Sequence, residues 1–339
     1  MIEFLGKLVR CEHLTEDEAS RAMELIMRDD ATPSQIAGLV VALRVKGETV
    51  DEIAGMARTA MALATPIEVS QPEALLDVVG TGGDGSHSFN ISTLSAIVAA
   101  ACGARVAKHG NRAASSICGA ADVLEALGVR IDLPPEGVAA CVAEVGIGFL
   151  FAPLFHPAFR YAGVPRRELG IRTVFNVLGP LCNPARAGRQ AMGVAEAGLA
   201  PKMADVLARL GTERAIVFHA EGLDELSTAG PSLVIELLDG ERRQYELEPL
   251  EYGLPRASAD DLRGGQPARN AEIARSVLAG ERGPRRDIVL LNASAALRAA
   301  GLAADWREGI GLAAEAIDEG RAGDLLERWV RTSRAAAPA

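Results

Sequence analysis

The pattern of hydrophobic and polar positions changes near residue 68 of this 339-residue chain. Before that point apolar residues recur at helical spacing, and from about residue 74 short apolar runs alternate with helical segments. Strands that alternate with helices build a largely parallel sheet covered on both faces. The pattern therefore predicts an α/β chain with a small all-helical domain over residues 1–68 and a larger domain over residues 74–335, whose mainly parallel sheet is flanked by helices. Helices near residues 164–184 are expected to join the helical domain.

Helix starts in the first region carry capping signals. Thr15 with Glu18 and Thr49 with Glu52 fit the capping box, in which a threonine hydroxyl and a glutamate carboxylate satisfy free N–H groups at the helix start. Thr32 precedes a proline, which is favoured in the first turn of a helix. These signals predict three helices that begin just after the three threonines.

The second region predicts strands with helices between them. Asp239-Gly240 is a strong signal for a two-residue hairpin turn, and the C-terminal stretch, rich in Ala, Arg and Glu, is typical of helices. The expected strands are residues 75–79, 104–107, 129–133, 148–151, 190–194 and 215–218, the hairpin strands are 233–238 and 243–247, and the expected helices are 93–102, 120–127, 135–144 and 199–210.

Composition and charge narrow the class of function. Hydrophobic residues make up 49% of the chain and charged residues 24%, which is ordinary globular usage, and the formal net charge is −10. An acidic chain is not a general nucleic-acid binder. Five cysteines without a CxxC pair fit a reducing cytosol, and the N-terminus lacks the apolar core of a signal peptide. No apolar run reaches the roughly 18 residues of a membrane span, so we expect a cytoplasmic chain with no nucleic-acid partner and no membrane segment.

A glycine-rich turn follows the first expected strand. Gly80, Gly82, Gly83 and Gly85 fall within six residues, and backbone N–H groups of such a turn, backed by a helix start, form a cradle for phosphate. The same residues match the dinucleotide pattern G-x-G-x-x-G. No acidic residue lies about 20 positions further on for a ribose hydroxyl, although Arg105 leaves an NADP oxidoreductase open. An ordinary strand-to-helix turn is the other alternative.

Three further segments carry candidate chemistry. Residues 108–116, KHGNRAASS, follow the second expected strand, and loops at the carboxyl ends of parallel strands meet at one edge, so we expect this basic loop beside the glycine turn. Asp224 and Glu225 follow Gly222 and suit Mg²⁺ with phosphate oxygens. The run from His156 to Arg172 supplies an imidazole and guanidiniums for a planar carboxylate. Solvated loops and a water-facing helix surface remain the alternative interpretations.

Together these segments resemble the anthranilate phosphoribosyltransferase family of tryptophan biosynthesis. The matching motifs, in order, are GTGGDGxxxFNIST at residues 80–93, KHGNRxxSS at 108–116, ADVLEALG at 121–128, HPA at 156–158, RRELGIRTxFNxLGPLxNP at 166–184 and GLDE at 222–225. The resemblance covers roughly residues 1–330. It implies transfer of phosphoribosyl from 5-phosphoribosyl 1-diphosphate (PRPP) to the amine of anthranilate, with diphosphate as the other product.

The resemblance also implies a role for particular residues. Asp224, Glu225 and Ser92 would bind Mg²⁺, with two ions expected and Glu225 shared between them. No residue is expected to act as a catalytic acid or base, because catalysis would come from positioning and electrostatics. Anthranilate would contact Gly80, Asn111, Arg166, His109, His156 and Pro180. PRPP would contact Gly80, Gly83, Asp84, Ser88, Asn90, Ile91, Ser92, Thr93, Lys108, His109, Gly110, Asn111, Arg112, Ala113, Ala114, Ser115, Ser116 and Ala120.

One departure and several alternatives accompany the resemblance. Ala120 stands where the family often has a serine, so one hydroxyl contact to PRPP is absent. A pyrimidine nucleoside phosphorylase or a non-catalytic paralogue of the same fold remains an alternative. The family implies a homodimer through the helical domain, and an association with anthranilate synthase stays open.

Overall fold

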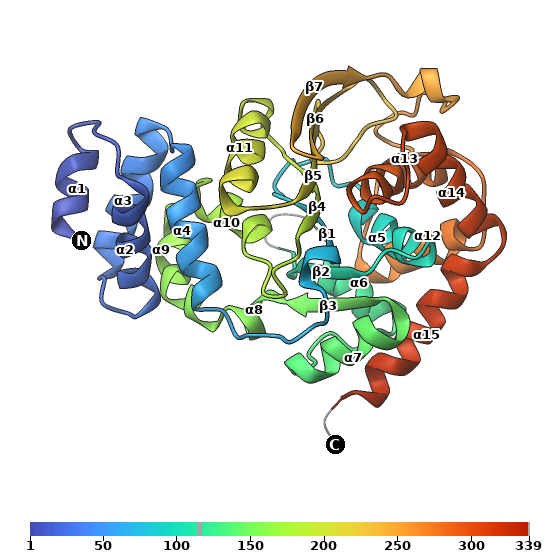
Figure 1. Cartoon of the computed structure of the whole chain (residues 1–339), viewed down its shortest axis with the longest axis horizontal. Helices are drawn as coiled ribbons and strands as arrows, with labels where there is room; N and C mark the ends of the chain where they lie inside the picture. Colours follow the sequence, from blue (N-terminus) through green and yellow to red (C-terminus); the bar gives the residue numbers. More distant parts are fainter. Residues whose placement is uncertain (114–116, 338–339) are drawn as a thin grey trace.

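A computed structural model describes residues 1–113 and 117–337. It consists of an N-terminal helical bundle and a larger α/β part, as the hydrophobic pattern predicts (Figure 1). None of the helices in the described ranges has the length and apolar character needed to cross a membrane.

The helical bundle begins with α1 (Ile2–Leu8), α2 (Glu16–Met27), α3 (Pro33–Lys46) and α4 (Val50–Ala62). Both predicted capping boxes are present: Thr15 and Glu18 exchange bonds at the start of α2, and Thr49 and Glu52 do so at the start of α4. Two short helices from much later in the chain, α9 (Gly163–Leu169) and α10 (Phe175–Leu178), pack against α3 and α4 respectively. The bundle is therefore built from two separate stretches of sequence.

Within residues 1–113 and 117–337 the sheet has seven strands, in the order β3-β2-β1-β4-β5-β6-β7. The first five strands in sequence are parallel, and β6 and β7 add an antiparallel hairpin at one edge. The mainly parallel sheet and the hairpin were predicted, whereas the strand order was not. The strands are β1 (Leu76–Gly80), β2 (Val106–Gly110), β3 (Ile147–Phe151), β4 (Arg189–Gly193), β5 (Arg214–Ala220), β6 (Ser232–Leu238) and β7 (Glu241–Leu247).

Helices cover the sheet on both faces (Figure 1). Short loops join most of these helices to the elements before and after them, as expected for an α/β fold. Among the described residues, the helices of this part are α5 (Ile91–Ala101), α6 (Ala120–Leu127), α7 (Pro135–Val145), α8 (Ala152–Phe155), α11 (Ala200–Leu210), α12 (Pro267–Leu278), α13 (Pro284–Ala299), α14 (Trp306–Asp318) and α15 (Arg321–Ala335). The 3₁₀ turns within the same residues are η1 (Pro72–Ala74), η2 (Pro157–Ala162), η3 (Gly179–Leu181), η4 (Ala197–Leu199) and η5 (Pro249–Tyr252).

Two details of the strand prediction are wrong. Residues 129–133 form no strand: Val129, Ile131 and Leu133 are buried in alternation, which imitates a strand, but the intervening Arg130 donates its N–H to Ser333 Oγ on α15 at 3.0 Å and not to a neighbouring strand. The second strand runs over Val106–Gly110 and not over residues 104–107, so the first residues of the expected basic loop belong to β2.

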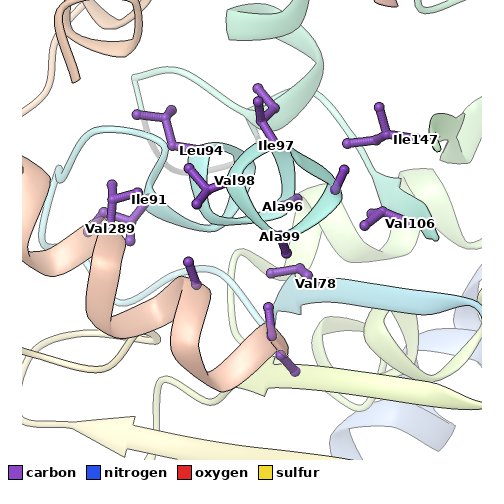
Figure 2. Packing of buried hydrophobic residues seen from close by; sticks show 14 of the residues in the cluster. Val78, Ile91, Leu94, Ala96, Ile97, Val98, Ala99, Val106, Ile147 and Val289 are labelled. Atoms are coloured by element: carbon purple, nitrogen blue, oxygen red, sulfur yellow. The ribbon is translucent and has the colours of Figure 1, made fainter. Parts of the chain in front are cut away.

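Two hydrophobic clusters lie on opposite faces of the sheet. On one face α5 is buried nearly all round; Figure 2 shows its side chains between Val78, Val106 and Ile147 of three strands and Val289 of α13. On the other face the cluster runs without interruption from strand residues such as Met192 through α11 into the helical bundle. Alternate residues along a strand thus pack into different hydrophobic clusters.

Candidate active site

The strand order reverses between β1 and β4. The chain passes from β1 to β2 on one side and from β4 to β5 on the other, and ligands bind at the carboxyl ends of strands where such a reversal occurs. A cavity of about 300 Å³ lies there. The glycine turn, the end of β2 with the segment after it, and the Asp224-Glu225 turn all line it, so the predicted convergence of these segments is confirmed.

Most of the residues predicted to bind PRPP line this cavity. Thr93 does not, because it is buried inside α5. Ala114, Ser115 and Ser116 lie outside the described residues. The predicted residues in the lining are Gly80, Gly83, Asp84, Ser88, Asn90, Ile91, Ser92, Lys108, His109, Gly110, Asn111, Arg112, Ala113 and Ala120, together with Asp224 and Glu225.

Asp224 lies directly over the ends of β1 and β4. A Cβ atom on Gly80 would come within 2.3 Å of Asp224 Oδ2, and one on Gly193 within 1.6 Å of the Asp224 carbonyl oxygen. Gly82 donates its N–H to Asp224 Oδ2 at 2.6 Å. Glycine is therefore needed at positions 80 and 193, because Asp224 lies too close to both for a Cβ atom to fit. The bond from Gly82 holds the acidic turn against the glycine turn.

Burial and mutual repulsion shift the pKa values of the two carboxyl groups. Burial, then the charge of Asp84, raises the pKa of Asp224 to about 7. Burial, then the charge of Asp224, raises the pKa of Glu225 well above its ordinary range. Ser92 donates its N–H to Glu225 Oε1 at 2.9 Å. Crowded carboxylates of this kind attract a cation.

The residues fit Mg²⁺ in the open manner typical of this ion. Among the described residues, no group of three or more His, Cys, Asp or Glu side chains is arranged to hold a metal by itself. Mg²⁺ often takes only one or two protein carboxylates and completes its shell with water and substrate phosphates. Asp224, Glu225 and the Ser92 hydroxyl are oxygen ligands of that kind.

Lys108 lies beneath the carboxylates and is only 2% exposed. Its ammonium donates to the Val78 carbonyl and to Ser92 Oγ. Burial lowers its pKa, while Asp77, Glu225 and Asp224 oppose that shift. Two hydrogen bonds thus fix the Lys108 ammonium at the base of the cavity, close to the carboxylates.

Asp122 organises the segment after β2, and sequence analysis missed it. Its Oδ2 accepts N–H bonds from Ala113 at 3.0 Å and Gly119 at 2.8 Å, and its Oδ1 pairs with Arg112 at 2.9 Å. Arg112 also pairs with Glu125, so its guanidinium is shared with the surface of α6. An acidic residue a few positions after a basic loop was the available signal.

A row of rings leads away from the cavity. The ring centroids of His109 and His156 are 5.1 Å apart, those of His156 and Phe159 5.3 Å, and those of Phe159 and Phe175 5.9 Å. The Arg166 guanidinium lies 5.4 Å from the centre of the Phe175 ring. The Arg166 guanidinium forms no hydrogen bond or ion pair with another of the described residues, and burial lowers its pKa.

Three of the predicted anthranilate contacts are not in the cavity lining. His156 and Arg166 lie along the ring row, and Pro180 lines a different cavity of about 320 Å³ between α4 and the sheet. His109 lines the main cavity, and its Nδ1 is 3.1 Å from the Gly179 carbonyl, so this nitrogen carries the proton. Burial, then the charge of His156, lowers the pKa of His109 to about 3, which keeps the ring neutral.

Comparison with known proteins distinguishes between the alternative functions of this site. A family described as "Glycosyl transferase family, a/b domain" matches residues 72–323, and its "helical bundle domain" matches residues 2–64. Anthranilate phosphoribosyltransferase 2 of Streptomyces coelicolor is 58% identical over 94% of this chain and 96% of that protein. The chain belongs to the anthranilate phosphoribosyltransferase family.

Solved structures of this family agree with the fold. The crystal structure from Thermus thermophilus has a TM-score of 0.93 and 48% identity, covering 98% of this chain and 99% of that one. The Saccharomyces cerevisiae protein in complex with PRPP and Mg has a TM-score of 0.89 and 29% identity, with 98% of each chain covered. Its complex with 4-fluoroanthranilate has a TM-score of 0.88 and 28% identity, covering 98% of this chain and 97% of that one.

Further residues, which the sequence did not single out, also shape the cavity. Asn176 from α10 lines it, which brings the helical bundle to the site. Arg172, expected only as one of several guanidiniums, donates to the Gly82 carbonyl at 2.7 Å and so fixes the glycine turn. Thr81 Oγ1 accepts the Ala195 N–H at 3.0 Å, joining the ends of β1 and β4.

Proposed function

We propose that this chain transfers the phosphoribosyl group of PRPP to the amine of anthranilate, giving N-(5′-phosphoribosyl)anthranilate and diphosphate in tryptophan biosynthesis. The observation that carries the proposal is one continuous arrangement. A phosphate cradle faces buried carboxylates at the ends of β1 and β4, and a row of rings leads from it to Arg166. Family membership gives independent support.

Arg166 suits the carboxylate of anthranilate. Its guanidinium is partly buried beside Phe175 and has no acidic partner among the described residues. A planar guanidinium binds a carboxylate through two parallel hydrogen bonds. His109, His156 and Pro180 are proposed as walls of the anthranilate path, and Gly80 and Asn111 as contacts where this path meets the PRPP cavity.

Ser92, Asp224 and Glu225 are proposed to hold Mg²⁺, with two ions as the expected number. The bound ion would neutralise charge on the diphosphate as it leaves the ribose. The chain's own part is to hold the carboxylates close to the glycine turn through the Gly82 and Ser92 N–H groups. Lys108 balances part of the negative charge when the cation is absent.

No general base is proposed. The arylamine is neutral at pH 7 and already nucleophilic, and His109, with a pKa lowered to about 3, is a weak base. The residues of the site instead orient the amine toward the ribose and exclude water.

The test is a fluorescence assay of the purified chain with anthranilate, PRPP and Mg²⁺. We expect anthranilate fluorescence to fall only when PRPP and Mg²⁺ are both present, and phosphorolysis of thymidine to be absent. Constant fluorescence, or release of thymine from thymidine and phosphate, would overturn the proposal.

A cytoplasmic homodimer is also proposed. Ile2, Val45 and Val164 are 78%, 82% and 44% exposed. They lie on α1, α3 and α9, which contact one another in the order α1, α3, α9. Clustered exposed apolar side chains mark association surfaces. An association with anthranilate synthase stays a prediction.

A further inference from the structure

Two asparagines on the C-terminal helices are buried beside the active-site turns. Asn270 on α12 and Asn292 on α13 are each 2% exposed. Neither lines the cavity itself. Each bonds through its side-chain amide to a residue far away in the sequence: Asn270 to Asn90, which lines the cavity, and Asn292 to Leu226, which follows the lining residue Glu225.

Asn292 holds the turn that carries the carboxylates. Its Oδ1 accepts the Leu226 N–H at 2.9 Å, and its Nδ2 donates to the Leu226 carbonyl at 2.9 Å. Nδ2 also donates to the Ile288 carbonyl, one turn earlier on α13, at 2.9 Å. Leu226 directly follows Glu225, so both polar groups of the adjoining residue are fixed to a long buried helix. Such a two-point contact leaves little freedom for the preceding side chain.

Asn270 holds the start of α5 and, through Asn90, the segment after β2. Its Nδ2 donates to Asn90 Oδ1 at 2.9 Å, and its Oδ1 accepts the Gly265 N–H at 2.7 Å. Asn90 in turn donates to the Cys118 carbonyl at 3.1 Å. The amides of Asn270 and Asn90 together link three chain segments, two of which line the cavity.

We propose that Asn292 and Asn270 are positioning residues for PRPP and its cation: Asn292 sets the place of Asp224 and Glu225, and Asn270 sets the place of Asn90 at the start of α5 and, through it, of the segment after β2. This inference rests on the proposed function. Only an amide supplies both bonds in each case, because a carboxylate cannot donate and an apolar side chain can do neither. Misplacement of a ligand group by about 1 Å is enough to lose about a hundredfold in rate.

The experiment measures PRPP affinity by calorimetry at several Mg²⁺ concentrations, together with urea unfolding of the free protein. The variants are Asn292→Ala and Asn270→Ala, and Asn292→Asp and Asn270→Asp, which keep the side-chain volume in case the alanine variants do not fold. Ser294→Ala is the matched control. Ser294 is fully buried on α13, two residues from Asn292, and donates to the Trp306 carbonyl at 3.0 Å, away from the cavity.

We expect about tenfold weaker PRPP binding in the asparagine variants and affinity within about twofold of wild type in Ser294→Ala. The Asn292 variants should also need more Mg²⁺ to reach half-maximal affinity, whereas the Asn270 variants should not. A loss of stability with PRPP affinity equal to that of the control would overturn the inference and leave a purely structural role. If the wild-type chain does not bind PRPP with Mg²⁺, the proposed function fails and this inference fails with it.

Discussion

Arg166 is the residue whose surroundings bear most directly on the acceptor substrate. Removing its guanidinium should raise the KM for anthranilate by about tenfold or more, the value of a charged hydrogen bond, with a much smaller change in the KM for PRPP. Steady-state fluorescence kinetics on Arg166→Ala measure both constants. The neighbouring Arg167 is exposed, so Arg167→Ala is the control and should leave both constants unchanged. An equal rise in the two KM values would remove Arg166 from the anthranilate site.

Asp224 is expected to be needed for turnover while lowering the stability of the folded chain. Asp224→Asn should lose about a hundredfold or more in Mg²⁺-dependent turnover, in line with the loss of a group that stabilises transition-state charge. Its resistance to urea should be equal or higher, because burial raises the pKa of this carboxyl to about 7 and its charged form is costly. Glu225→Gln should behave alike. Glu221→Gln, at an exposed position of the same turn, should keep both activity and stability; near-normal turnover in Asp224→Asn would disprove the metal assignment.

Asp77 gives a pH dependence of stability that is separate from catalysis. It lies in β1, 1% exposed, and accepts the His109 N–H at 3.1 Å. Burial raises its pKa from 3.8 to about 6, so the folded chain holds this proton more tightly than the unfolded chain. This contribution to stability is therefore present below pH 4, falls as pH rises to about 6, and is constant above that.

The loss amounts to about 3 kcal/mol at pH 7, because each pKa unit is worth about 1.4 kcal/mol. Asp77→Asn cannot ionise, so the variant should gain about 2 kcal/mol of stability relative to wild type between pH 4.5 and pH 7, because about a third of the loss has already occurred at pH 4.5. Urea unfolding at the two pH values measures the difference. Asp205→Asn, a half-exposed carboxyl on α11, should show no such change, and a pH-independent difference for Asp77→Asn would contradict the assignment.

At the residue level, sequence motifs predicted the polar groups of the site well and their neighbours poorly. The glycine turn and the basic segment that begins at Lys108 were correctly expected to be neighbours, because the carboxyl ends of parallel strands share one edge. Gly193 and Asn292 gave no local signal, since their importance comes from contacts with residues far away in sequence. Only the folded chain brings those contacts together.

At the level of elements, the three capping boxes of the bundle differ in burial and so should differ in energy. Glu52 at the start of α4 is fully buried, pairs with Lys46 at 2.9 Å and also accepts the Leu14 N–H at 2.9 Å. Gln35 at the start of α3 forms an exposed box with Thr32. Breaking a buried ion pair costs about 3–5 kcal/mol, whereas losing a simple cap costs about 1 kcal/mol.

Glu52→Ala should therefore lower the free energy of unfolding several times more than Gln35→Ala. Urea unfolding followed by far-ultraviolet circular dichroism provides the comparison, with Gln35→Ala as the matched control. Equal losses in the two variants would mean that the Lys46 and Leu14 contacts contribute nothing beyond the cap.

Element types were easier to predict than element partners. The capping signals and the Asp239-Gly240 hairpin were correct because they act over a few residues. The strand expected at residues 129–133 was wrong because alternating burial has two causes. A strand produces it within a sheet, and an extended segment produces it against a helix, here α15. Periodicity alone does not distinguish them.

At the scale of the whole molecule, the helical bundle and the sheet share one hydrophobic cluster. Met192 and Val217 of the sheet, Leu207 of α11 and Leu43 of α3 all belong to it. A division of the chain at residue 68 is visible in the sequence because the periodicity changes there. The shared core is not, since it depends on which face of β4 and β5 the bundle covers. Asn176 reaches the cavity through this contact.

The outer side of the bundle gives the last prediction. If α1, α3 and α9 form the homodimer surface, charges placed there should separate the subunits, because an unpaired charge buried in an interface is strongly unfavourable. Val45→Asp combined with Ile2→Asp should change the mass in solution from that of two chains to that of one, 35.5 kDa, in light scattering after size exclusion. Leu302→Asp is the control, since this residue is 40% exposed between α13 and α14, at the opposite end of the molecule from α1 (Figure 1). A dimeric double variant, or a monomeric control, would place the interface elsewhere, and a monomeric wild type would exclude the homodimer.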